Sequence, residues 1–247
     1  MFVTVTVLLL SGFLGGFIGA QVGAGAVIIL PVLLFMGLPL PVAVATTAPA
    51  GWLMNAVASV KYWQSKKINL RFVLPLSVIA AIGAVVGAKL LFVIDASLLA
   101  KLFAVVFTGL GVLLFVKPES NTRTAGHLTG GRLLLGLILA LILGIYGGIL
   151  AAGLTTIALL VFNLVLRQPR LEAVANSVLF SALLLSTSLV VFVFSHRINY
   201  AFATPLALGS IAGSYYGAAT ILKKNIVYFK SLMVLVIIGV VVKLMFF

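Results

Sequence analysis

The chain has 247 residues, of which 64% are hydrophobic and only 8% are charged. This composition cannot cover a water-soluble domain with polar surface, so it predicts a protein embedded in a lipid bilayer. The formal net charge is +13, but Lys and Arg occupy short gaps between apolar runs, which indicates membrane topology and contact with anionic lipid rather than nucleic-acid binding.

Apolar runs of about 20 residues, the length that crosses a ~30 Å hydrocarbon core, recur along the whole chain. In chain order the predicted segments are 2–36, 41–62, 72–94, 97–116, 133–166, 171–194, 201–222 and 226–246. The first of them has no basic leader region, so we expect it to stay in the membrane. The polar stretch 117–132 divides the chain into two transmembrane units, 1–116 and 133–247. We therefore predict an all-α polytopic membrane protein.

The two units are copies of one another. SKKINLRFVLP at 65–75 returns 130 residues later as SHRINYAFATP at 195–205, and the same offset places Gly23 on Gly153 without any gap. This regularity predicts an internal duplication. Each copy would contain a Gly-broken helical hairpin followed by three transmembrane helices.

The orientation of the copies depends on whether the broken segment crosses the membrane or returns to the same side. If it returns, the copies are inverted and most of the 16 Lys and Arg residues share one face; if it crosses, the copies are parallel and these residues divide almost evenly. The positive-inside rule favours inversion. We therefore expect the N-terminus outside, and connector 65–75 and linker 117–132 in the cytoplasm.

Gly-interrupted segments at matching positions of two inverted copies are typical of secondary transporters, whose site lies near the midplane between the copies. GFIGAQVGAGA at 16–26 and YGGILAAGLTT at 146–156 are the first candidates, because glycine permits a bend that exposes backbone N–H groups. Their predicted substrate contacts are Gln21, Gly23, Gly25, Gly153 and Thr155. The alternative is that the glycines only pack helices together, which we favour for Gly-x-x-x-Gly pairs of the third span such as those at 83–87 and 213–217.

A second candidate is AVATTAPAGW at 43–52 with its copy AVANSVLFSA at 173–182. Thr46 and Thr47 align with Asn176 and Ser177, all of which favour helix N-caps, so we expect half-helix N-termini there that bind an anion. The alternative is that the hydroxyls bond back to their own helix. Asn55 joins the predicted site as an isolated amide in apolar sequence. Tyr62 and Tyr146 are weaker candidates, because aromatics at span ends usually mark the membrane interface.

The remaining residue types argue against other chemistry. Only three residues are acidic, none in the middle of a predicted span, and the chain has no cysteine. Hence we expect no metal site, no cofactor, no carboxylate proton relay and no enzymatic activity. A site without carboxylates but with half-helix N-termini indicates an anionic substrate.

The stretch GGFIGAQVGAGAVIILP, the Ala-x-Ala-Thr-Thr motif, the Ile-Asn connector and the following Pro-x(7)-Gly-x(3)-Gly-Ala span together resemble the sulfite exporter family, TauE/SafE. The resemblance covers nearly the whole chain. The chain departs from the pattern in its second copy, which reads AAGLTT in the Gly-rich segment and Asn176-Ser177 at the polar pair.

The resemblance implies a bacterial inner-membrane permease for sulfite or organosulfonates such as sulfoacetate. Combined with the duplication, it predicts alternating access at a midplane site, with a small anion and the lipid bilayer as partners. A carrier for another small organic or inorganic anion, and a non-transporting membrane scaffold, stay open as alternatives. Export and import, coupling to a proton, to sodium or to no ion, and a homodimer as the oligomeric state are all compatible with the residues.

Overall fold

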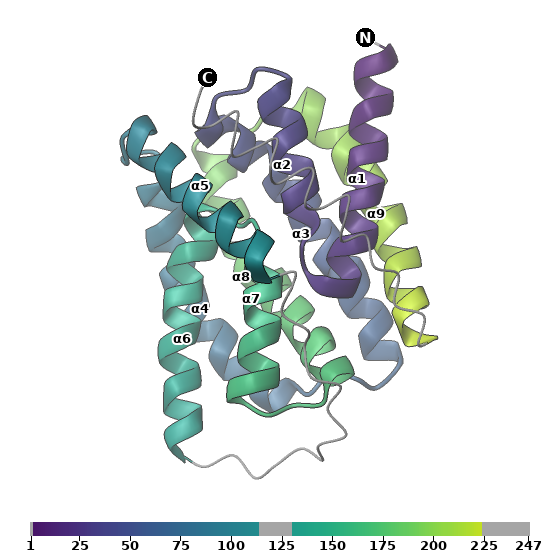
Figure 1. Cartoon of the computed structure of the whole chain (residues 1–247), viewed down its shortest axis with the longest axis vertical. Coiled ribbons are helices and arrows are strands. Elements are labelled where there is room, and N and C mark those ends of the chain that lie inside the picture. The colour runs from purple at the N-terminus through teal and green to yellow at the C-terminus, as the bar shows by residue number, and fades with distance from the viewer. Residues whose placement is uncertain (1, 114–129, 224–247) are drawn as a thin grey trace.

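The computed structural model describes residues 2–113 and 130–223, and within these ranges every regular element is helical (Figure 1). The first predicted copy contains α1 (Phe2–Val22), α2 (Gly25–Phe35), α3 (Leu40–Gln64), α4 (Leu70–Leu90) and α5 (Ala96–Leu113). The second contains α6 (Gly130–Ile149), α7 (Leu154–Leu160), the π-helical turn η1 (Val161–Val165), α8 (Arg170–Phe194) and α9 (Tyr200–Leu222).

The helices confirm the all-α membrane architecture. Among the described residues, α1, α3, α4, α6 and α8 are long and apolar enough to cross a bilayer. The segments predicted at 97–116 and 201–222 form α5 and α9. Helix α6 begins at Gly130, three residues before the predicted segment 133–166, and the last predicted segment, 226–246, lies outside the described residues, as does most of linker 117–132.

Each broken segment folds back on itself. A Cβ added to Gly15 in α1 would lie 2.7 Å from the Ile29 side chain of α2, so the two arms run side by side in opposite directions. The second copy repeats this arrangement, since Gly147 near the end of α6 faces Leu154, and Gly136 near its beginning faces Leu166. In Figure 1, α1 descends from its N-terminal end at the top of the view, whereas α6 rises from the bottom.

The copies exchange a helix. Helix α9 of the second copy packs along α1 and α3 of the first, and α4 of the first copy packs along α6 and α8 of the second. Glycine makes these contacts possible, because Gly213 of α9 lies directly against the Phe13 carbonyl of α1, and Gly83 of α4 against the Leu141 carbonyl of α6. The prediction that the third-span glycines pack helices is therefore confirmed.

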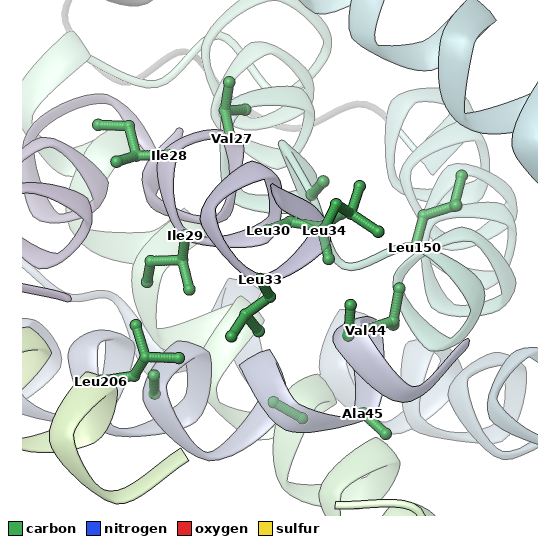
Figure 2. Close-up of a cluster of buried hydrophobic side chains, with 14 of the residues drawn as sticks. Val27, Ile28, Ile29, Leu30, Leu33, Leu34, Val44, Ala45, Leu150 and Leu206 are labelled. Atoms are coloured by element: carbon green, nitrogen blue, oxygen red, sulfur yellow. The ribbon is translucent and has the colours of Figure 1, made fainter. Parts of the chain in front are cut away.

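Aliphatic side chains on the returning arm α2 form the middle of one of the two buried apolar clusters. Ile29, Leu30 and Leu33 are at most 1% exposed. Figure 2 shows the side chains of α2 beside residues from three other parts of the chain: Val44 and Ala45 of α3, Leu150 just after α6, and Leu206 of α9. Large apolar side chains such as Val78 and Ile82 of α4 face outward instead. A surface of this kind suits contact with lipid tails.

Candidate functional site

Both returning arms begin at a glycine in the left-handed conformation. Gly23 has φ of 80° and Gly153 has φ of 72°, a region that costs other residues about 1–2 kcal/mol. Neither α2 nor α7 has a side-chain hydrogen bond at its N-cap. The first N–H groups of a helix have no acceptor one turn earlier. Two of them bond locally here, since the Val27 N–H donates to the Ala24 carbonyl and the Leu154 N–H to the Ala151 carbonyl. The expected bend at these two glycines is confirmed.

The two breaks touch each other. A Cβ on Gly23 would lie 2.5 Å from the Thr155 carbonyl carbon and from the Thr156 nitrogen. The Thr156 hydroxyl donates a hydrogen bond of 2.9 Å to the Val22 carbonyl. The end of α1 is thereby joined to the start of α7, and no residue other than glycine fits at position 23.

Two tyrosines hold the carbonyl groups that the breaks would otherwise leave without partners. The Tyr62 hydroxyl donates to the Ala20 carbonyl at 2.7 Å, and the Tyr146 hydroxyl donates to the Ala152 carbonyl. Tyr62 is fully buried in α3. A tyrosine at the membrane interface and a tyrosine that is a buried hydroxyl donor look alike in the sequence, so only tertiary contacts reveal the role of these two.

Asn55 of α3 completes this central region. The Thr155 hydroxyl donates to Asn55 Oδ1 at 3.3 Å, and Asn55 Nδ2 donates to the carbonyl of Gly51, one turn earlier. A Cβ on Gly25 would meet the Met54 sulfur at 2.7 Å. Six of the predicted site residues lie in or beside this region, which we call the break junction: Gln21, Gly23, Gly25, Asn55, Gly153 and Thr155.

The other four predicted site residues lie in uninterrupted helices. The expected half-helix N-termini at Thr46, Thr47, Asn176 and Ser177 are wrong, since α3 begins at Leu40 and α8 at Arg170 and both continue through these positions. The Thr47 hydroxyl donates to the Val44 carbonyl at 2.7 Å, and the Ser177 hydroxyl to the Val174 carbonyl at 2.9 Å. These local bonds satisfy the hydroxyl donors without a helix break.

The side chains of Thr46 and Asn176 instead accept hydrogen bonds from the backbone of the repeated connectors. The Asn199 N–H donates to the Thr46 hydroxyl oxygen at 3.0 Å, and the Asn69 N–H donates to Asn176 Oδ1 at 2.8 Å. The side chains of Asn69 and Asn199 also cap α4 and α9. The Ile-Asn connector therefore recurs because in each copy it starts one helix and binds the polar residue of the other copy.

The break junction brings several hydrogen-bond donors together. Its donors are threonine hydroxyls, an amide and helix N-terminal N–H groups, and such donors stabilise anions. Among residues 2–113 and 130–223, no cluster of three or more His, Cys, Asp or Glu residues could hold a metal ion. In the conformation described, the hydroxyls of Thr155 and Thr156 bond across to the other copy.

Comparison with known proteins agrees with this architecture. A family model described as "Sulfite exporter TauE/SafE" matches residues 8–244. A "Probable membrane transporter protein ORF9" from Sinorhizobium sp is 24% identical over 96% of this chain and 91% of its own length. A "Probable membrane transporter protein" from Haemophilus influenzae is 27% identical over 89% of this chain and 86% of its own length. No solved structure matches the chain.

Proposed function

This chain belongs to the sulfite exporter TauE/SafE family, and from that premise we propose that it carries small anions, sulfite or organosulfonates such as sulfoacetate, across the bacterial inner membrane. The contact between the two breaks carries the proposal. Gly23 of one copy lies against Thr155 and Thr156 of the other, so the interrupted helices of both copies meet at one place inside the protein. This is the arrangement expected for a transporter site built between repeats.

We propose further that the copies are inverted. Among the described residues, six of the seven left-handed backbone positions form pairs 130 residues apart, namely Gly23 with Gly153, Gly37 with Arg167, and Lys66 with His196, and Ala151 is the exception. Matching strained positions support two copies of one fold. The returning arms and the distribution of Lys and Arg then favour opposite orientations in the membrane.

The substrate oxygens would bind at the break junction when the copies separate there. Thr155 and Thr156 now donate to Asn55 Oδ1 and the Val22 carbonyl of the first copy. Separation breaks both bonds and frees two hydroxyl donors beside the N–H groups that begin α2 and α7. A bound anion replaces the lost protein acceptors, which is the physical basis of the alternating access that we propose.

Thr47 and Ser177 contribute only after their hydroxyls rotate away from the local carbonyls. Thr46 lies nine residues before Asn55 in α3, roughly 13 Å along the helix axis. The four residues Thr46, Thr47, Asn176 and Ser177 would therefore contact substrate on its path rather than at the break junction.

Efflux needs no obligatory energy source in this scheme. A membrane potential that is negative inside contributes about 2.3 kcal/mol per elementary charge per 100 mV, so a dianion is driven outward by roughly twice that amount.

Flux in proteoliposomes tests the proposal. Vesicles containing the protein should release labelled sulfite or sulfoacetate faster than empty vesicles, and Thr155→Val should lower that rate about tenfold, because the variant lacks one donor to a charged group. Thr108→Val is the matched control, since the exposed Thr108 hydroxyl bonds only to the Ala104 carbonyl of its own helix. Release at the rate of empty vesicles contradicts the substrate assignment. Unchanged flux in Thr155→Val contradicts the site.

A further inference from the structure

A second group of buried polar side chains lies where the hairpin of the second copy ends and α8 begins. We call it the amide cluster: Asn163 of η1, Gln168, and Asn176 of α8. All three are at most 3% exposed. Asn163 lies eight residues beyond Thr155 on the returning arm, roughly 12 Å from the break junction along a helix axis.

The hydrogen bonds of the amide cluster fix the orientation of each amide. The Asn69 N–H makes Asn176 Oδ1 an acceptor, so Asn176 Nδ2 is the atom that donates to Gln168 Oε1, at 2.7 Å. Asn163 Nδ2 donates to the main-chain carbonyl of Gln168 at 3.0 Å. Exchanging the oxygen and nitrogen of any of these amides would break a bond.

This orientation leaves one donor and one acceptor without partners. Gln168 Nε2 and Asn163 Oδ1 are both buried and have no hydrogen-bond partner. Each such atom costs about 1–3 kcal/mol when it is removed from water and left unpaired, so a buried pair of this kind calls for an occupant that supplies both an acceptor and a donor.

The fold itself does not require these amides. The positions equivalent to Asn163 and Gln168 in the first copy are Leu33 and Leu38, and that copy also forms a returning arm followed by a long helix. The π-helical turn that holds Asn163 lies in the second copy, and turns of this kind occur frequently at functional sites. The amide cluster is therefore an addition to the repeat rather than part of its framework.

We infer that the amide cluster is a second substrate subsite that recognises an organosulfonate bearing a hydroxyl group, such as 2-hydroxyethanesulfonate. This inference rests on the proposed function. A sulfonate oxygen accepts from Gln168 Nε2, and the hydroxyl donates to Asn163 Oδ1. A sulfonate without a donor leaves the Asn163 oxygen unpaired, which weakens its binding. Gln168 lies between two basic residues in the sequence, Arg167 and Arg170.

Calorimetric titration of the purified full chain with 2-hydroxyethanesulfonate and with ethanesulfonate tests the inference, because the two ligands differ only in the hydroxyl. Wild-type protein should bind the hydroxylated ligand about tenfold more tightly. Asn163→Leu should abolish this preference and leave the affinity for ethanesulfonate unchanged. Gln168→Leu should weaken both ligands, since both use the sulfonate donor. Leu164→Ala, an exposed neighbour in η1, should keep the preference.

Asn163→Leu and Gln168→Leu are both expected to fold, because leucine occupies the equivalent positions of the first copy. The preference of the wild-type protein for one ligand over the other is measured without any substitution. Equal wild-type affinity for the two ligands overturns the inference while leaving the proposed function intact. A preference that survives Asn163→Leu also overturns it and indicates that the amide cluster holds only a buried water. Failure of wild-type protein to bind either ligand contradicts the proposed transport of sulfonates together with the inference.

Discussion

Asn69 and Asn176 lie in different copies of the duplicated unit, yet the N–H of Asn69 donates to Asn176 Oδ1 at 2.8 Å. The equivalent bond of the other pair joins the N–H of Asn199 to the Thr46 hydroxyl oxygen at 3.0 Å. Each connector thus attaches the exchanged helix that follows it, α4 or α9, to the copy against which that helix packs. These two bonds give the polar residues of α3 and α8 a structural role that is independent of substrate.

Replacing Thr46 tests this role. Thr46→Val keeps the side-chain shape but leaves the Asn199 N–H without its acceptor, so we expect a loss of about 1–2 kcal/mol in the free energy of unfolding. Thr46→Asn should retain most of the stability, because the second copy uses asparagine at the equivalent position. Thermal unfolding in detergent measures both. Equal unfolding temperatures for Thr46→Val and wild type would show that the connector bond contributes nothing.

Gly23 and Gly37 both have a left-handed backbone, but only Gly23 is closely packed, so replacing each by alanine distinguishes the cost of backbone strain from the cost of a steric clash. Gly23 and Gly37 have φ of 80° and 87°, but a Cβ on Gly37 would meet nothing within 4 Å, whereas one on Gly23 would collide with Thr155. Gly37→Ala should cost about 1–2 kcal/mol from strain alone. Gly23→Ala adds overpacking of about 1–3 kcal/mol and should abolish flux. Comparable stability and flux in the two variants would contradict the contact between the breaks.

The buried Tyr62 of the first copy corresponds to Phe192 of the second, so the second copy shows that a ring without a hydroxyl fits at this position. Tyr62→Phe removes the hydrogen bond to the Ala20 carbonyl, and the ring fits because phenylalanine occupies the equivalent position 192. Since the carbonyl stays buried without a partner, we expect a loss of about 1–3 kcal/mol of stability and lower flux. Tyr216→Phe, at an exposed position, is the control. Identical behaviour of both variants would exclude Tyr62 as the residue that holds the first break.

Membrane topology can be read from two equivalent surface positions. Lys66 and His196 are exposed and adopt nearly the same φ, 54° and 53°, and the chain has no cysteine of its own. With a membrane-impermeant maleimide on intact cells, His196→Cys should be labelled, whereas Lys66→Cys should react only after the membrane is opened, because inverted copies place the two connectors on opposite sides. Labelling of both from the same side would mean that the copies are parallel.

The sequence by itself determined the membrane environment, the internal match at an offset of 130 residues and the positions of the two helix breaks. These features follow from local properties: apolar runs long enough to span the bilayer, and glycines at 23 and 153 that alone tolerate the left-handed backbone at low cost. The family followed from short motifs repeated in order across the chain.

Only the tertiary structure decided which polar residues meet. Thr46 and Thr47 have the local character of helix caps, but packing against α8 and α9 keeps α3 continuous, and a connector 153 residues away uses the Thr46 hydroxyl. The exchange of α4 and α9, the hydroxyl contacts of Tyr62 and Thr156, and the unpaired atoms of Asn163 and Gln168 depend equally on distant contacts. Inside a membrane protein a buried polar group can bond within its own helix or to a distant partner that the folded chain brings within reach, and only the tertiary structure shows which of the two it does.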